Sequence, residues 1–140
     1  MQHSTNPAKL VYRFALVFAL FAAFYITSCK NSPIIRVDGV YQSKKNGDTF
    51  EYLRFYPDGS VITVSSTGTA ADIAKWFNKS GKDLSKGNYT LTGQHLKFSS
   101  TDSYGTVDYD GDIKGDVILL KTYSHINGYH GSDEYLFVKN

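Results

Sequence analysis

The chain of 140 residues carries 15 lysines and arginines against 13 aspartates and glutamates, and its formal net charge at pH 7 is +2. Two of the basic residues, Lys9 and Arg13, belong to an N-terminal leader, and without them 13 of each sign remain. Because the lysines are scattered, with Lys44 and Lys45 the only adjacent pair, the composition argues against nucleic acid as a partner.

The leader has the layout of a secretory signal peptide. After Lys9 and Arg13 come thirteen uncharged, mostly apolar residues at 14–26, followed by two small polar residues at 27–28. A membrane-spanning helix needs about 18 to 20 apolar residues, so this run is short for a span. The sequence therefore predicts export of the rest of the chain.

The only cysteine stands directly behind the leader, which excludes a disulfide within the chain. The tetrad Ile26-Thr27-Ser28-Cys29 resembles the lipobox of bacterial lipoproteins. The resemblance implies a diacylglyceryl thioether on Cys29, signal cleavage between Ser28 and Cys29, and acylation of the new amino terminus, with palmitate as a typical chain. The alternative is a free cysteine at the end of the leader.

Two or three acyl chains anchor a protein firmly without spanning the membrane. The resemblance therefore implies a lipid-anchored protein of the bacterial cell envelope, with the outer membrane favoured and the folded domain outside the cytoplasm. The expected organisation is a signal peptide at 1–28, a lipidated tether at 29–37 that contains Pro33, and one β domain at 38–140.

Short apolar runs separated by turn residues fill the β domain. The clearest turn is Pro57-Asp58-Gly59, where proline presets one dihedral and glycine accepts a positive φ, so a hairpin is expected around it. The pattern predicts strands at 40–43, 50–56, 61–65, 88–92, 95–99, 106–113, 117–124 and 134–138.

One amphipathic helix of about ten residues is expected between the third and fourth strands. Thr69 and Asp72 form a capping-box-like start, and Gly81 follows the end. Ile73, Trp76 and Phe77 fall on one helical face, which predicts that all three pack against the sheet.

The predicted fold is all-β: about eight antiparallel strands in a meander that closes into a small barrel or a two-sheet sandwich. The strand starts and turns at 38–41, 52–59, 87–89 and 115–119 resemble those of small bacterial lipoproteins with a lipocalin-like β-barrel. This resemblance implies the barrel, whose interior is filled by side chains or holds one small ligand.

Arg54 is the residue that most invites a ligand, because it lies in mid-strand on the face shared by Tyr52 and Tyr56. If that face points into the barrel, a buried arginine among phenols suits a carboxylate-bearing ligand. If Leu53 and Phe55 point inward instead, Arg54 is a surface residue and Glu51 is the one out-of-pattern residue of the strand; we favour this second interpretation. The weak ligand-binding candidates are Tyr52, Arg54, Tyr56 and Trp76.

Two further polar groups are weighed as metal sites. Asp108, Asp110 and Asp112 lack the glycine and glutamate spacing of a calcium loop, so a solvated strand face is expected. His125 and His130, near Asp133 and Glu134, fix no tetrahedral geometry, so a flexible polar loop at 126–132 is expected. No metal, cofactor or catalytic residue is predicted, and the protein is not expected to be an enzyme.

Two non-enzymatic functions remain. The first is a barrel that binds a small apolar or amphipathic ligand. The alternative is an interaction or structural lipoprotein that contacts another envelope protein.

Overall fold

The structure is a computed structural model that describes residues 35–44 and 46–139. The predicted signal peptide, the lipobox with Ser28 and Cys29, and most of the predicted tether lie outside the described residues. Among the residues that are described, none of the helices is long and apolar enough to cross a membrane.

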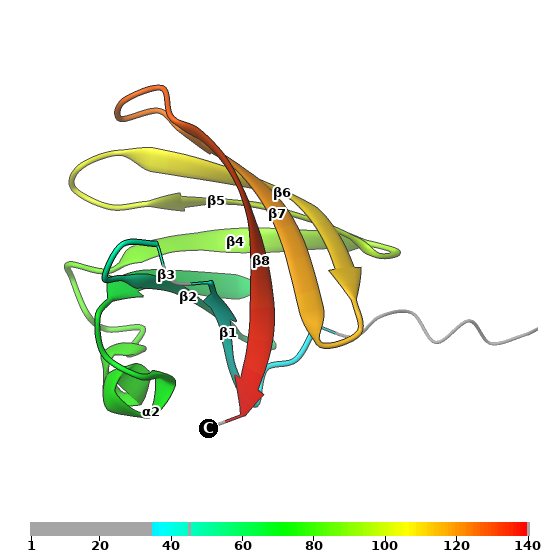
Figure 1. The fold of residues 1–140 in the computed structure, drawn as a ribbon, viewed down its shortest axis with the longest axis horizontal. Helices are drawn as coiled ribbons and strands as arrows, with labels where there is room; N and C mark the ends of the chain where they lie inside the picture. The colour runs from blue at the N-terminus through cyan, green and yellow to red at the C-terminus, as the bar shows by residue number, and fades with distance from the viewer. Residues whose placement is uncertain (1–34, 45, 140) are drawn as a thin grey trace, which may run out of the picture. The chain divides into compact units, whose positions relative to one another are not determined.

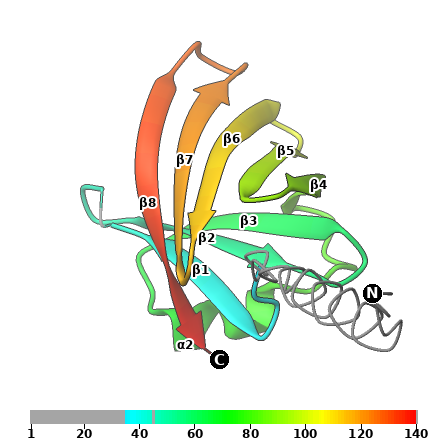
Figure 2. The same ribbon diagram turned by 90° about the vertical axis from the view of Figure 1, so that its right-hand side faces the viewer.

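Eight antiparallel strands form a closed barrel, in which each strand pairs with the next and β8 also pairs with β1 (Figures 1 and 2). This confirms the predicted all-β meander and selects the barrel over the sandwich. The strands are β1 (Gly39–Ser43), β2 (Phe50–Phe55), β3 (Ser60–Ser66), β4 (Ser85–Thr92), β5 (His95–Thr101), β6 (Thr106–Lys114), β7 (Val117–Ser124) and β8 (His130–Lys139).

The strand starts differ most from the predicted ones at β4, which begins at Ser85 instead of residue 88, and at β8. Strand β8 begins at His130, four residues before the predicted start, because the β7–β8 ladder continues to the pair Tyr123 and His130. The turn at its head is closed by a hydrogen bond from the Gly128 N–H to the Ser124 carbonyl at 2.9 Å. The predicted loop at 126–132 is therefore shorter than expected, and its second half belongs to the sheet.

The barrel interior is apolar over most of its length. Side chains alternate along each strand, so that Leu53 and Phe55 of β2 point inward while Tyr52 points outward. The inner cluster is rich in aromatic rings packed edge to face, among them Phe55 against Tyr41, Tyr89 and Phe98. Its buried members are Ile35, Tyr41, Leu53, Phe55, Val61, Leu96, Phe98, Tyr109, Ile113, Ile118, Leu120 and Tyr135.

One end of the barrel is closed by the segment that leads into β1. Ile35 is buried in the inner cluster, and the backbone N–H of Arg36 donates to the Tyr41 hydroxyl at 3.0 Å. The Arg36 guanidinium lies over the Phe137 ring at 3.7 Å and pairs with Asp38 and with Asp116 in the β6–β7 turn. The domain thus begins to pack at Ile35, within the stretch that the sequence assigns to the tether.

A short helical segment covers the outer face of β1–β3. It consists of the α-helix α2 (Ala70–Ile73) and the 3-10 helix η1 (Ala74–Trp76) (Figure 1). The predicted capping box is present: the Asp72 N–H donates to Thr69 Oγ1, and the Thr69 N–H donates to the Asp72 carboxylate.

The helical segment is shorter than predicted and docks differently. Ile73 is fully buried and Phe77 nearly so, as expected, but Trp76 is 47% exposed, so its predicted burial is wrong. The helix ends at Trp76, and Phe77 has a non-helical ψ of 51°. The i, i+3, i+4 spacing therefore does not place Trp76 and Phe77 on one face. The outer cluster contains Val40, Tyr52, Ile62, Ala70, Ile73 and Phe77.

Candidate functional site: a polar cavity at the open end of the barrel

The other end of the barrel opens into a cavity of about 640 Å³. Consecutive antiparallel strands place alternate connections at the same end, so the β1–β2, β3–β4, β5–β6 and β7–β8 connections all surround this mouth. The lining residues are mostly polar: Asn46, Glu51, Thr63, Val64, Ser65, Trp76, Asp83, Leu84, Ser85, Asp102, Val107, Tyr109, Thr122, Ser124, Asn127, Tyr129 and Asp133.

Glu51 of β2 is one of the carboxyl groups that line this cavity. It shares the inward face of β2 with Leu53 and Phe55, because residues two apart on a strand point the same way. Its Oε1 accepts a hydrogen bond from the Tyr109 hydroxyl and its Oε2 accepts one from the Tyr135 hydroxyl, each at 2.5 Å. Such short distances are typical of hydroxyls that donate to an ionised carboxylate. The carboxyl group of β2 is thus bridged to β6 and β8.

The surroundings shift the pKa of all three groups. Burial raises the pKa of Glu51, and the charge of Asp133 adds to this, while the two phenol hydrogen bonds lower it; the net shift is upward. Burial and the adjacent Glu51 raise the pKa of Tyr109 and of Tyr135. Both phenols therefore stay protonated and remain hydrogen-bond donors to Glu51.

One wall of the barrel next to the cavity carries a short chain of hydroxyl groups. Thr63 Oγ1 lies 2.9 Å from Ser100 Oγ, which lies 2.5 Å from Ser85 Oγ. Thr63 and Ser100 are buried, and each hydroxyl satisfies its neighbour. The apolar barrel core therefore gives way to polar groups toward the mouth.

The mouth itself combines carboxylates with aromatic rings. Asp83, Asp102 and Asp133 line it, together with the half-exposed Trp76 and Tyr129. No lysine, arginine or histidine is among the described lining residues. The cavity is therefore acidic.

Three of the four predicted ligand-binding residues lie together, but on the outer face of the barrel and away from the cavity. The hydroxyl of Tyr52 donates to the Gly68 carbonyl and that of Tyr56 to the Phe77 carbonyl, each at 2.7 Å, so both phenols hold the helical segment on the outer face. Arg54 lies on the same outer face, with its guanidinium carbon 5.6 Å from the centre of the Tyr56 ring. Of the four candidates, Trp76 alone lines the cavity.

Leu53 and Phe55 point inward, which is the favoured of the two interpretations of Arg54. In that interpretation Glu51 is a charged residue on the otherwise apolar inward face of β2. This exception is the one feature of the sequence that points to the cavity. Tyr109 and Tyr135, in contrast, fall at positions where an aromatic residue fits an ordinary core, so nothing in the sequence distinguishes them.

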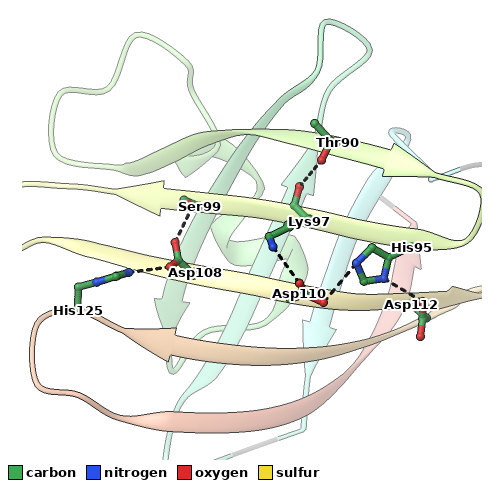
Figure 3. Close-up of polar contacts among 8 residues, drawn as sticks. All are labelled: Thr90, His95, Lys97, Ser99, Asp108, Asp110, Asp112 and His125. Carbon is green, nitrogen blue, oxygen red and sulfur yellow. Dashed lines mark hydrogen bonds and ion pairs between the residues drawn. The ribbon is translucent and has the colours of Figure 1, made fainter.

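A second polar cluster lies on the outer face of β5 and β6 (Figure 3). The three aspartates of β6 point outward, as predicted, and pair across to the neighbouring strands. Asp110 lies 3.3 Å from both Lys97 Nζ and His95 Nε2, and Asp108 accepts from Ser99 Oγ at 2.5 Å. His125 Nε2 lies 2.7 Å from the other Asp108 oxygen. These pairs are solvent-exposed and account for the acidic run as a solvated strand face.

Within the described part of the chain, no group of three histidine, cysteine, aspartate or glutamate side chains is placed to hold a metal ion. His125 and His130 instead flank the ring of Tyr123, with ring centres 4.7 and 4.6 Å from it.

No known protein family, curated protein or solved structure matches this chain.

Proposed function

We propose that this chain is a lipid-anchored envelope lipoprotein whose barrel binds a small ligand in the open-end cavity. The observation that carries the proposal is the cavity of about 640 Å³ with the Glu51 carboxyl group inside it. A volume of this size suits a small molecule. An interior carboxyl group is costly to bury, and a barrel with a purely structural core would be filled by apolar side chains instead.

The lining makes an amphipathic or polar ligand a better fit than a wholly apolar one. Carboxylates, amides and hydroxyls predominate in the cavity. Its apolar and aromatic lining residues are Val64, Trp76, Leu84, Val107, Tyr109 and Tyr129. We propose binding rather than catalysis, because the two phenols fix the Glu51 carboxyl group in place and leave its remaining lone pairs to a ligand.

A thermal-shift screen of the full-length protein in a non-ionic detergent tests binding. Ligand classes are organic cations, short glycans, fatty acids and sterols. A ligand at a hundredfold excess over its dissociation constant should stabilise the folded state by about 2.7 kcal/mol. Ser65→Trp, which fills the exposed mouth, should abolish the shift, whereas Arg54→Ala on the outer face should retain it. A shift that survives Ser65→Trp and disappears in Arg54→Ala would contradict binding in the cavity.

Lipidation rests on the resemblance of residues 26–29 to the lipobox and needs its own test. Metabolic labelling with a fatty acid in a bacterial host should label the chain, and Cys29→Ser should remove the label and release the protein from the membrane fraction. Equal labelling of the two proteins would overturn the anchor without bearing on the cavity.

The second candidate, contact with another envelope protein, is favoured by exposed aromatic and aliphatic side chains on two neighbouring connections. Tyr104 is 83% exposed, and Ile126 and Tyr129 are more than half exposed. These connections adjoin each other, since the His125 N–H donates to the Thr106 carbonyl. Site-specific cross-linking from position 104 in the host envelope should capture one partner if this function holds, and should capture none if the barrel acts alone.

A further inference from the structure

We infer that the ligand carries a positively charged amine or quaternary ammonium group, and that Glu51 is the residue that binds this group. The inference rests on the proposed function and specifies the chemical class of the ligand. It follows from the charge of the cavity, from the direction of the hydrogen bonds at its floor, and from the aromatic residues at its mouth.

The cavity holds four carboxyl groups and no described cationic side chain among its lining residues. Glu51 lies on the inward face of β2, Asp133 lies on the inward face of β8 two residues from Tyr135, and Asp83 and Asp102 lie at the mouth. Asp133 makes no hydrogen bond or ion pair with the other described residues. This contrasts with the aspartates on the outer face, which pair with His95, Lys97 and His125. Within residues 35–44 and 46–139, no cationic side chain of the lining offsets these carboxyl groups.

The floor of the cavity is rich in acceptors. Each phenol has one hydrogen, and Tyr109 and Tyr135 both donate theirs to Glu51, so their oxygens have only lone pairs left to offer. A carboxylate has about four acceptor directions, of which the two phenols occupy two. The part of a bound molecule that contacts this floor is met by acceptors, so donors or a positive charge fit there and an anionic group would be repelled.

A cation also offsets an electrostatic cost that a neutral ligand leaves in place. Burial and the charge of Asp133 both disfavour ionised Glu51. A positive charge within about 4 to 6 Å favours the ionised form of a carboxyl group, so binding of a cation should lower the pKa of Glu51.

Trp76 and Tyr129 give the mouth a surface that suits such a ligand. Aromatic faces attract ammonium groups, and quaternary ammonium ligands in particular. Both rings are half exposed, although they line the cavity, and the docking of the helical segment depends on Ile73 and Phe77 instead of Trp76.

Isothermal titration of the full-length protein in a non-ionic detergent tests the inference with a matched pair of probes. Choline carries a quaternary nitrogen, and 3,3-dimethylbutan-1-ol has the same shape with carbon in its place. We expect choline to bind at least tenfold more tightly than the alcohol, and its affinity to fall as salt is raised. Titration in two buffers of different ionisation enthalpy should show proton release on binding.

Two variants with the same change in net charge separate the cavity from the outer surface. Glu51→Gln should weaken choline binding at least tenfold, whereas Asp110→Asn, on the outer face of β6, should leave it within twofold of the wild type. Should Glu51→Gln fail to fold, as judged by its thermal transition, Asp133→Asn provides the second test and should weaken binding at least threefold.

The possible failures can be told apart. Equal binding of choline and the alcohol, or loss of affinity in Asp110→Asn but not in Glu51→Gln, overturns the cationic ligand and leaves the binding function standing. Tighter binding of acetate or glucose than of choline does the same. If choline, the alcohol, acetate and glucose all fail to bind, and the thermal-shift screen is also negative, the proposed binding function itself is overturned.

Discussion

Glu51 lines the cavity, and its ionisation affects the stability of the barrel. Its carboxyl group sits among the inward side chains of the barrel, where ionisation is disfavoured by burial and only partly offset by two phenol hydrogen bonds. A group held in this way contributes less stability when charged than when protonated. Ionisation of Glu51 is therefore expected to reduce the stability of the barrel.

We predict that Glu51→Gln removes one component of the pH dependence of stability. The pKa of Glu51 is raised in the folded state, so the folded protein binds the proton more tightly than the unfolded chain, whose value is near 4.5. The contribution of Glu51 to stability is then greatest below about pH 4.5 and is lost as the pH rises through the folded-state pKa. The amide cannot ionise, so the variant should become more stable than the wild type at pH 8.

Urea unfolding at pH 4 and pH 8 measures this difference. Other carboxylates act in the opposite direction, since hydrogen bonds and ion pairs lower the pKa of Asp58 and of Asp108, and their contribution is lost as the pH falls. The comparison is therefore between the two proteins at each pH. A free-energy difference that stays constant from pH 4 to pH 8 would contradict the prediction.

The residues of this site show how far the sequence could predict it. Alternation along β2 predicted the inward face of Leu53 and Phe55 and left Glu51 as the exception on that face. Its partners could not be predicted, because Tyr109 and Tyr135 lie 58 and 84 residues along the chain from Glu51. Which strands face each other across a barrel depends on its closure and register, and neither can be derived from the local periodicity of the sequence.

Among the elements, the helical segment is the one that the sequence describes least accurately. Its start is correct, since a capping box is a local motif of four residues. Its end and docking face are not, because a segment of seven residues is too short to hold helical periodicity by itself and takes its shape from the sheet beneath. The carbonyl of Phe77, bound by the Tyr56 hydroxyl, helps to fix where it ends.

We predict that Ile73→Ala destabilises the barrel by about 2 to 5 kcal/mol, because a fully buried isoleucine leaves a cavity when truncated. Trp76→Ala should cost less than about 1 kcal/mol, because the tryptophan is half exposed. Since Trp76 is the only tryptophan, unfolding of both variants and of the wild type is followed by far-ultraviolet circular dichroism. A larger loss for Trp76→Ala than for Ile73→Ala would show that the tryptophan is the main docking residue.

Strand β6 carries a glycine at a point of close approach between strands. A methyl group on Gly111 would lie 1.8 Å from the Leu119 carbonyl oxygen of β7, and backbone atoms cannot yield as a flexible side chain can. We predict that Gly111→Ala lowers the free energy of unfolding by about 1 to 3 kcal/mol, because the added methyl group overpacks the contact between β6 and β7. Gly68→Ala, whose nearest contacts would be at an ordinary 3.4 Å, is the control for adding a methyl group. Equal urea midpoints for the two variants would contradict the prediction.

At the scale of the whole molecule, the barrel is divided along its length. Ile35 and the Arg36 contacts close one end, the aromatic core fills the middle, and the polar cavity occupies the other end. The meander and the barrel could be predicted because turns and alternating strands are local signals repeated eight times. The division into a filled half and a hollow half could not, because it depends on side-chain volumes summed over many strands.

The pairing of β1 with β8 has a consequence for the order in which the protein folds. The first and last strands are neighbours, so the barrel cannot close until nearly the whole chain is available, and contacts between such distant segments form slowly (Figure 2). Tyr135 and Asp133 both lie on β8. The carboxyl bridge and the cavity are therefore completed by the same late step that closes the barrel, and a partly folded intermediate that lacks β8 has neither of them.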